Sequence, residues 1–208
     1  MHEHRSTAAP PPRSTSANRT TLPARVYTDP EWFAAEMDRI FAGMWLGACR
    51  IEQIASRGDF VRRDVAGASV LIVGDGQGSA RAFHNVCRHR GTRLCDRENG
   101  SFAGSIQCPY HGWTYDLQGR LIGAPQMDEV EGFRRDQYPL HAVACDVWDG
   151  HVFINMAGSP SPLTDHLGQL PSRFVPWRMT ELRMVRRVEY DVKANWKLIV
   201  QNYNECLH

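Results

Sequence analysis

The sequence predicts a mainly β fold, an antiparallel sandwich of short strands, with an N-terminal helix before it and the start of an α+β domain after it. Between about residues 45 and 155, short apolar runs alternate with turns rich in glycine and polar residues. Before this region, apolar side chains recur at helical spacing. After it, a linker-like stretch at 157–162 leads to further helix and strand candidates. Together these patterns indicate one complete β domain flanked by other elements.

The composition argues against a nucleic-acid-binding, membrane-spanning or secreted protein. The chain has 208 residues, 42% hydrophobic and 23% charged, with a formal net charge of +1, so no overall charge attracts it to nucleic acid or an anionic membrane. No apolar run approaches the roughly 20 residues that span a bilayer, and the first twenty residues lack the apolar core of a signal peptide. We therefore expect a cytoplasmic protein with no nucleic-acid or membrane partner. Its six cysteines are expected to be reduced thiols, because a chain of this size can bury a core without crosslinks.

The N-terminal part divides into a tail and a helical segment. Residues 1–21 are of low complexity, with three consecutive prolines, and predict a disordered tail. Residues 22–44 predict a helical segment, in which Thr28 or Asp29 can cap a helix and Pro30 suits its first position. An apolar stripe along this helix is expected to pack against a core; it consists of Trp32, Phe33, Met37, Ile40, Phe41 and Met44.

The β domain is predicted to cover residues 45–158. Its strand candidates are residues 45–49, 59–65, 69–73, 80–84, 105–107, 113–116, 119–122, 140–148 and 151–155. Asp149-Gly150, between the last two, is typical of a two-residue hairpin turn. The start of the second domain, residues 159–208, is predicted to contain a short helix at 163–170, a strand at 182–192 and a helix from Asn195 onward.

Two short motifs inside the β domain combine cysteine with histidine. Cys87-Arg88-His89 and Cys108-Pro109-Tyr110-His111 give Cys-x-His and Cys-x-x-His, separated by 18 residues. A Rieske [2Fe-2S] cluster needs two thiolates on one iron and two imidazoles on the other, so each loop offers one ligand of each kind. A structural zinc site is the alternative, but zinc motifs usually pair cysteine with cysteine and histidine with histidine. The sequence therefore favours Cys87, His89, Cys108 and His111 as ligands of a [2Fe-2S] cluster.

With these motifs, the sequence resembles the α subunits of Rieske non-haem iron oxygenases, the aromatic-ring-hydroxylating type. The segments 85–91 and 108–113 are similar to that family's two cluster loops, and 22–31 and 148–155 are similar to the segments that open and close its Rieske domain. The resemblance implies an electron donor, either a reductase or a ferredoxin, and a homotrimer. It also implies a mononuclear Fe(II) in addition to the cluster.

The last residues resemble the start of the family's iron-binding helix. The resemblance implies that His208 is the first ligand of the mononuclear Fe(II). It also implies that Glu205 links this ligand by a hydrogen bond to the neighbouring subunit's cluster histidine, which by position is His111. Asn202, Glu205 and His208 follow at three-residue spacing, which puts them on neighbouring parts of one helix face.

Two functions remain open at this point. One is an oxygenase that inserts oxygen from O₂ into an aromatic or N-methyl substrate, as monooxygenase or dioxygenase. The other is a stand-alone Rieske electron carrier. A facial triad requires two histidines and one carboxylate, and His208 is a single ligand. We therefore expect these 208 residues to accept electrons without oxygenating a substrate.

Overall fold

The computed structural model describes residues 22–127 and 129–205, and its backbone divides into two compact units. The larger comprises Ala34–Lys193, and the smaller joins the segment ending at Phe33 to the segment beginning at Ala194. The tail predicted at 1–21 lies outside the described residues. Among the described helices, none is both long and apolar enough to cross a bilayer.

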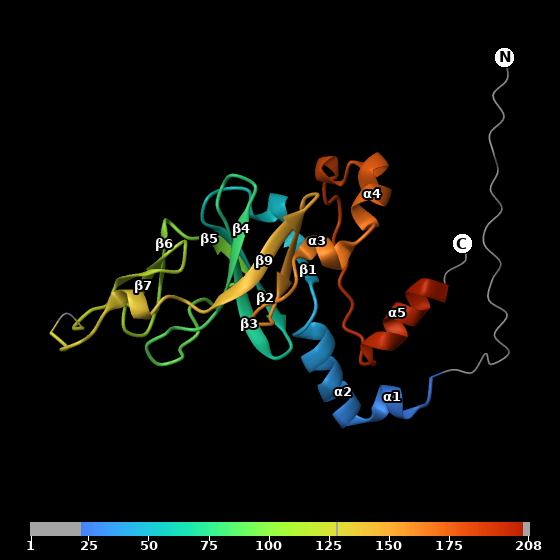
Figure 1. The fold of residues 1–208 in the computed structure, drawn as a ribbon, viewed down its shortest axis with the longest axis horizontal. Coiled ribbons are helices and arrows are strands. Elements are labelled where there is room, and N and C mark those ends of the chain that lie inside the picture. Colours follow the sequence, from blue (N-terminus) through green and yellow to red (C-terminus); the bar gives the residue numbers. More distant parts are fainter. Residues whose placement is uncertain (1–21, 128, 206–208) are drawn as a thin grey trace, which may run out of the picture. The chain divides into compact units, whose positions relative to one another are not determined.

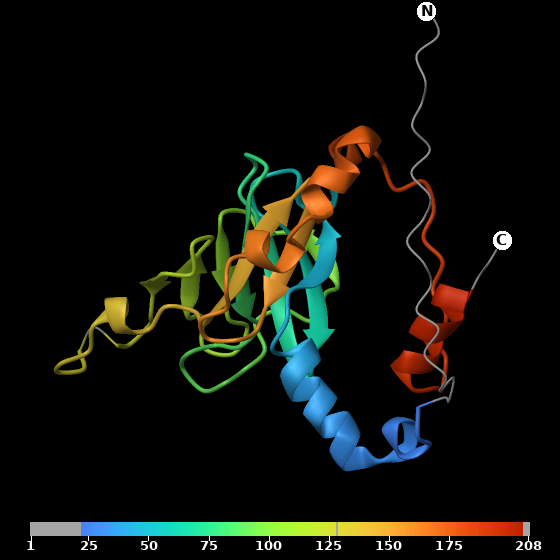
Figure 2. The same ribbon diagram turned by 45° about the vertical axis from the view of Figure 1, so that its right-hand side comes forward.

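The larger unit is built on a seven-stranded antiparallel sheet in the order β1-β10-β9-β4-β3-β2-β5 (Figure 1). Its strands are β1 (Leu46–Arg50), β2 (Asp59–Val65), β3 (Ala68–Gly74), β4 (Ala80–His84), β5 (Asn99–Ser101), β9 (Ala142–Trp148) and β10 (His151–Asn155). A three-stranded sheet comprises β6 (Ser105–Gln107), β7 (Thr114–Asp116) and β8 (Leu121–Gly123). The small sheet lies at the opposite end of this unit from helix α4 (Leu170–Phe174), as both ribbon views show (Figures 1 and 2).

Helices are short throughout the chain. The α-helices are α1 (Arg25–Thr28), α2 (Pro30–Glu36), α3 (Leu163–Leu167), α4 (Leu170–Phe174) and α5 (Trp196–Glu205). A π-helical turn, η1 (Met37–Phe41), continues α2. The 3₁₀ turns are η2 (Ile51–Ile54), η3 (Arg135–Gln137), η4 (Val175–Trp177) and η5 (Met179–Glu181).

Strand β3 is buried on both of its faces, because successive side chains of a strand point to opposite sides. Val70 and Ile72 belong to one apolar cluster, here called the sheet core, which also contains Ile54, Val61, Ala82, Val143, Val152 and Ile154. Leu71 and Val73 belong to a second cluster, the inter-sheet core, which joins β2, β3 and β4 to the small sheet. The inter-sheet core also contains Phe60, Phe83, Cys87, Leu94, Ile106, Cys108, Trp113, Tyr115, Leu117, Leu121, Ala124 and Leu140.

Most of the predicted elements are confirmed. The strands predicted at 59–65, 80–84, 105–107 and 151–155 have the predicted bounds, and the other five differ by one or two residues at their ends. Asp149 and Gly150 both have positive φ, 46° and 79°, which a tight hairpin turn requires. The helix predicted from Pro30 begins there, and the one predicted at the end of the chain is α5.

Two predictions are wrong. Residues 182–192 form no strand, since a segment becomes part of a sheet only where another strand takes its hydrogen bonds and none of the described segments does so. The apolar stripe of the N-terminal helix is only partly covered: Trp32 and Phe33 are 41% and 45% exposed. The helix widens at η1, where the Ala42 N–H bonds the Met37 carbonyl at 2.9 Å, and this turn breaks the helical periodicity of the stripe.

We expect Gly119→Ala to destabilise the larger unit by about 2–4 kcal/mol. Gly119 has a φ of +82°, and an added Cβ would lie 2.5 Å from the buried Phe83 ring. Gly78→Ala is the matched control, because Gly78 has a similar φ of +88° with no atom near the added Cβ, and it should cost only about 1 kcal/mol. Urea denaturation measures both variants. Equal losses of stability would contradict the steric argument.

We expect the thiols of Cys49 and Cys145 to alkylate slowly at pH 8. Burial raises the pKa of Cys49 to about 11 and that of Cys145 to about 12. Since only the thiolate reacts, labelling by iodoacetamide should be more than about a hundredfold slower than that of free cysteine and should rise about tenfold per pH unit. Peptide mass spectrometry measures the rates. Labelling at the rate of free cysteine would contradict the burial.

Candidate metal centre

The first cysteine–histidine loop turns back on itself within six residues. The Thr92 carbonyl accepts a hydrogen bond from the Cys87 N–H at 2.8 Å, and the Cys87 carbonyl accepts one from the Gly91 N–H at 3.0 Å. Gly91 has a φ of +70° with open space where a Cβ would be. Its conformation, rather than its small size, therefore explains why glycine suits this position.

The second loop repeats this turn with the same spacing. The Cys108 N–H donates to the Trp113 carbonyl at 2.7 Å, and the Gly112 N–H donates to the Cys108 carbonyl at 3.1 Å. Gly112 has a φ of +71°, almost identical to that of the glycine in the first loop. Both loops therefore present a cysteine at the first position of one backbone turn and a histidine within it.

The two cysteines lie next to each other in the inter-sheet core. Cys87 and Cys108 are each 3% exposed. Burial raises the pKa of Cys108, and the neighbouring Cys87 side chain raises it further. The Tyr115 hydroxyl lies 3.4 Å from the Cys87 sulfur and accepts a hydrogen bond from the Arg88 N–H at 3.0 Å. Burial raises the pKa of Tyr115 well above its usual range, so this phenol stays protonated and can donate to the sulfur.

The two histidines also lie together, on the more exposed side of the loops. The ring centroids of His89 and His111 are 4.7 Å apart, with the ring planes at 71°. His89 stacks on the buried indole of Trp113 at 5.0 Å and 8°, and Tyr110 lies against His111 at 3.8 Å. Burial lowers the pKa of His89, and nearby His111 and Arg90 lower it further. The neutral imidazole favoured by these neighbours is the form that binds metals.

An aromatic wall supports the histidine pair from behind. Trp113 meets Phe133 and Tyr138 edge to face, with centroids 5.8 and 5.7 Å away, and Phe133 stacks on Tyr138 at 5.1 Å. Edge-to-face packing fixes ring orientation as well as burying apolar surface. Trp113 is 2% exposed, so the face of His89 that it covers is closed to water.

A buried asparagine anchors the first loop. The Asn85 side-chain oxygen accepts hydrogen bonds from the Leu94 and Cys95 N–H groups at 3.1 and 3.0 Å. Its amide nitrogen donates to the Cys95 carbonyl at 2.7 Å and to the Ser69 hydroxyl at 3.2 Å. Sequence reasoning missed both Asn85 and Tyr115 as parts of the site. The place of Tyr115 on the buried face of a predicted strand was the one available signal.

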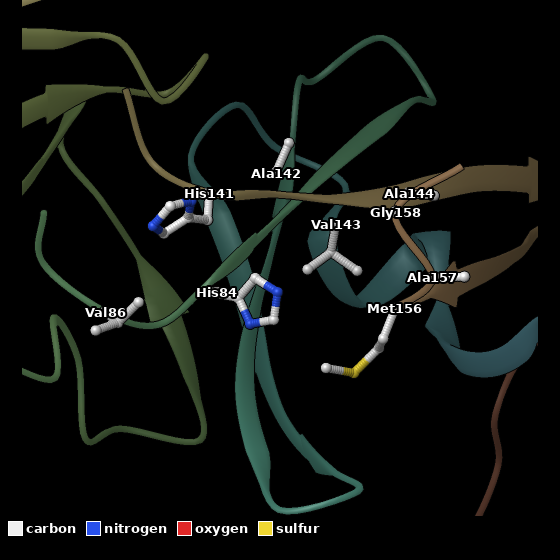
Figure 3. Close-up of a pocket in the computed structure, with 9 residues that line it drawn as sticks. All are labelled: His84, Val86, His141, Ala142, Val143, Ala144, Met156, Ala157 and Gly158. Atoms are coloured by element: carbon white, nitrogen blue, oxygen red, sulfur yellow. The ribbon is translucent and has the colours of Figure 1, made fainter. Parts of the chain in front are cut away.

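A pocket of about 640 Å³ lies beside the first loop, between β4, β9 and the end of β10 (Figure 3). Its histidines, His84 and His141, approach edge to face with centroids 6.5 Å apart, and burial, followed by the nearby His141, lowers the pKa of His84. The Arg88 guanidinium bonds His141 Nδ1 at 3.2 Å. The lining residues include Val86 but none of the four candidate ligands, so the pocket is separate from the metal centre.

The donor set fits a binuclear cluster of the Rieske type. The four side chains form one thiol pair and one imidazole pair, which is the arrangement in which one iron takes two thiolates and the other two imidazoles. Across the described residues, no three histidine, cysteine or acidic side chains gather around the position of one metal ion.

Two of the three residues predicted for a second iron site, Asn202 and Glu205, lie in the smaller compact unit. Asn202 and Glu205 are exposed residues of α5, and His208 lies outside the described residues. The structure therefore brings together Cys87, His89, Cys108 and His111 and leaves the second iron site a prediction.

Two family matches correspond to the two parts of the chain. Residues 44–134 match the Rieske [2Fe-2S] domain, and residues 179–208 match the ring hydroxylating alpha subunit (catalytic domain). The first match contains both cysteine–histidine loops, and the second contains α5.

Individual relatives agree with these matches. The chain is 37% identical to the glycine betaine monooxygenase oxygenase subunit of Chromohalobacter salexigens, over 90% of this chain and 42% of that protein. It is 36% identical to the carnitine monooxygenase oxygenase subunit of Escherichia coli, over 90% of this chain and 50% of that protein.

A solved structure extends the likeness to the fold. The crystal structure of the apo form of a quaternary ammonium Rieske monooxygenase superposes with a TM-score of 0.83 and 34% identity, over 89% of this chain and 55% of that chain. The chain spans about half the length of the curated relatives that it matches. The chain therefore contains a Rieske [2Fe-2S] domain followed by a segment of a ring hydroxylating alpha-subunit catalytic domain, and its sequence and fold are similar to those of Rieske oxygenase subunits.

Proposed function

We propose that Cys87 and Cys108 bind one iron of a [2Fe-2S] cluster and that His89 and His111 bind the other. The observation that carries this proposal is the separation of the two donor pairs, with buried thiols on one side and more exposed imidazoles on the other. Such a cluster supplies a one-electron redox centre at a higher potential than an all-cysteine cluster. Of the protein groups around it, the Tyr115 hydroxyl lies against the Cys87 sulfur and Trp113 keeps water from one face of His89.

We further propose that the whole protein is an oxygenase, in which residues 45–158 carry electrons and residues 159–208 begin the part that holds a mononuclear Fe(II). In this proposal His208 is the first iron ligand, and Glu205 connects it to a cluster histidine of a neighbouring subunit. Asn202 lies on the same helix. A reductase or ferredoxin supplies the electrons, and the protein forms a homotrimer. The match of residues 179–208 to a catalytic domain supports an oxygenase over a stand-alone electron carrier.

The names of the relatives favour one of the two substrate classes. Glycine betaine and carnitine, named for the two curated relatives, are both N-methylated quaternary ammonium compounds, and the superposed structure is of a quaternary ammonium monooxygenase. We therefore propose monooxygenation of an N-methyl ammonium substrate rather than oxidation of an aromatic ring. An assay of the whole protein with an electron donor, O₂ and both kinds of substrate tests this choice.

We expect the purified chain to contain two irons and two sulfides, and Cys108→Ser or His111→Ala to lose them, because each variant removes one ligand of a pair. His141→Ala is the control, since its imidazole lies near the first loop but outside the donor set. Iron and sulfide analysis measures occupancy, and nitrogen hyperfine couplings in the electron paramagnetic resonance spectrum of the reduced protein report histidine ligation. Stoichiometric zinc, or a reduced cluster without nitrogen couplings, would contradict the assignment.

We expect Tyr115→Phe to lower the reduction potential of the cluster by on the order of 50 mV. The Tyr115 hydroxyl lies 3.4 Å from the Cys87 sulfur, and a hydrogen bond there stabilises the more negative, reduced state. A loss of about 1 kcal/mol corresponds to this shift, because a tenfold change in a one-electron equilibrium is 59 mV. Tyr138→Phe is the control, because Tyr138 lies in the aromatic wall behind the histidines rather than against the Cys87 sulfur. Redox titration measures both, and equal potentials would contradict a role for the Tyr115 hydroxyl.

A further inference from the structure

We infer that Tyr27, near the start of the chain, is a positioning residue for helix α5. Tyr27 lies in α1, yet it contacts residues of α5 more than 160 positions later in the sequence. Its backbone carbonyl contacts the residue just before α5, and its aromatic ring and its hydroxyl contact two positions within that helix. Both segments belong to the smaller compact unit. The functional meaning of this contact rests on the proposed function, in which α5 carries Glu205.

The first contact is with the residue that caps α5. The Asn195 side-chain oxygen accepts a hydrogen bond from the Lys197 N–H at 3.1 Å, the usual role of asparagine before the first turn of a helix. The Asn195 amide nitrogen is then free of the helix and donates to the Tyr27 carbonyl at 3.1 Å. One side chain therefore caps α5 and ties that cap to α1.

The second contact is between a cation and a ring. The Lys197 ammonium lies 5.8 Å from the centroid of the Tyr27 ring and 5.3 Å from that of the Trp196 ring. Both distances are within the range in which the face of an aromatic ring attracts a cation. This contact holds the first turn of the helix against the side of Tyr27.

The third contact lies one turn further along. The Tyr27 hydroxyl donates to the Gln201 side-chain oxygen at 3.0 Å and accepts from the Gln201 amide nitrogen at 2.8 Å. Both polar atoms of the Gln201 carboxamide therefore hydrogen-bond to the Tyr27 hydroxyl. Because the two partners are 174 positions apart, this pair closes the smaller unit.

These contacts set the rotation of α5 about its own axis. Lys197, Gln201 and Glu205 follow at four-residue spacing, so they form one stripe along the helix. Fixing the first two therefore fixes the direction in which Glu205 projects. A slip of one residue would turn that side chain by about 100°, since the helix has 3.6 residues per turn.

Burial contributes little to holding this helix. None of its residues is buried, and four of its apolar residues are about half exposed or more: Leu198, Ile199, Val200 and Tyr203. A helix of ten residues is marginal in water by itself. The contacts of Tyr27 are therefore important polar constraints on the orientation of α5.

Hydrogen–deuterium exchange of the whole chain tests the inference. Tyr27→Phe keeps the ring and the backbone carbonyl but removes the hydroxyl, and the amides of α5 should exchange about fivefold faster, the effect of one ordinary hydrogen bond. Tyr203→Phe is the matched control, because Tyr203 lies on the same helix and is 81% exposed, and its exchange should equal that of the unmodified chain. Unchanged exchange in Tyr27→Phe would overturn the inference.

Two substitutions of the partner separate hydrogen bonding from helix propensity. Glutamine, glutamate and methionine have similar helix propensities. Gln201→Glu keeps an acceptor for the Tyr27 hydroxyl and should retain most of the protection, whereas Gln201→Met should lose as much as Tyr27→Phe. The double variant Tyr27→Phe/Gln201→Met should exchange no faster than either single variant. Additive effects, or equal effects of the two Gln201 substitutions, would overturn the pairing.

Measurements on the cluster distinguish the inference about Tyr27 from the proposed function. Its candidate ligands lie in the larger unit, so iron and sulfide content and the reduction potential should be the same in Tyr27→Phe and the unmodified chain. Failure of the unmodified chain to bind a cluster would overturn the proposed function without affecting the exchange result. A loss of the cluster in Tyr27→Phe alone would overturn the assignment of Tyr27 to α5.

Discussion

The candidate metal centre depends on one constraint, which is that two separate loops must adopt the same backbone turn. In each loop the cysteine N–H and carbonyl are both used in closing the turn, and a glycine with a φ near +70° reverses the chain. This geometry sends each cysteine inward and leaves each histidine toward solvent. A cluster bound by these two thiols and two imidazoles would have its sulfur end in the protein interior and its nitrogen end toward solvent.

The packing of the two sheets against each other holds those two loops together. The inter-sheet core contains side chains from β2, β3 and β4 on one side and from β6, β7 and β8 on the other, and Cys87 and Cys108 belong to it. Tyr115 reaches from β7 in the small sheet to the first loop, while Asn85 ties that loop to β3 through Ser69. The cysteines are therefore positioned by the same packing that joins the two sheets.

The sequence predicted what local patterns determine. Alternating apolar residues and turn glycines located nine strands, and the cysteine–histidine spacing located the candidate ligands. Strand β5, Asn99–Ser101, was missed because it has no apolar residue and exists only through its pairing with β2. The opposite error arose at 182–192, where the alternation is present but no described segment pairs with it. Tyr115, Asn85 and Tyr27 act through contacts 9 to 174 positions away, which no short motif encodes.

The order of strands in the large sheet has a consequence for folding. Strands β2, β3 and β4, the pair β9 and β10, and the three strands of the small sheet each pair with sequence neighbours. Strand β1, in contrast, pairs with β10, and Arg50 meets His151 across 101 positions. Closing so long a loop costs chain entropy before any contact compensates for it. In the finished sheet β1 covers the edge of β10, so a chain in which β1 had not yet paired would leave β10 as an open edge to which another chain could add.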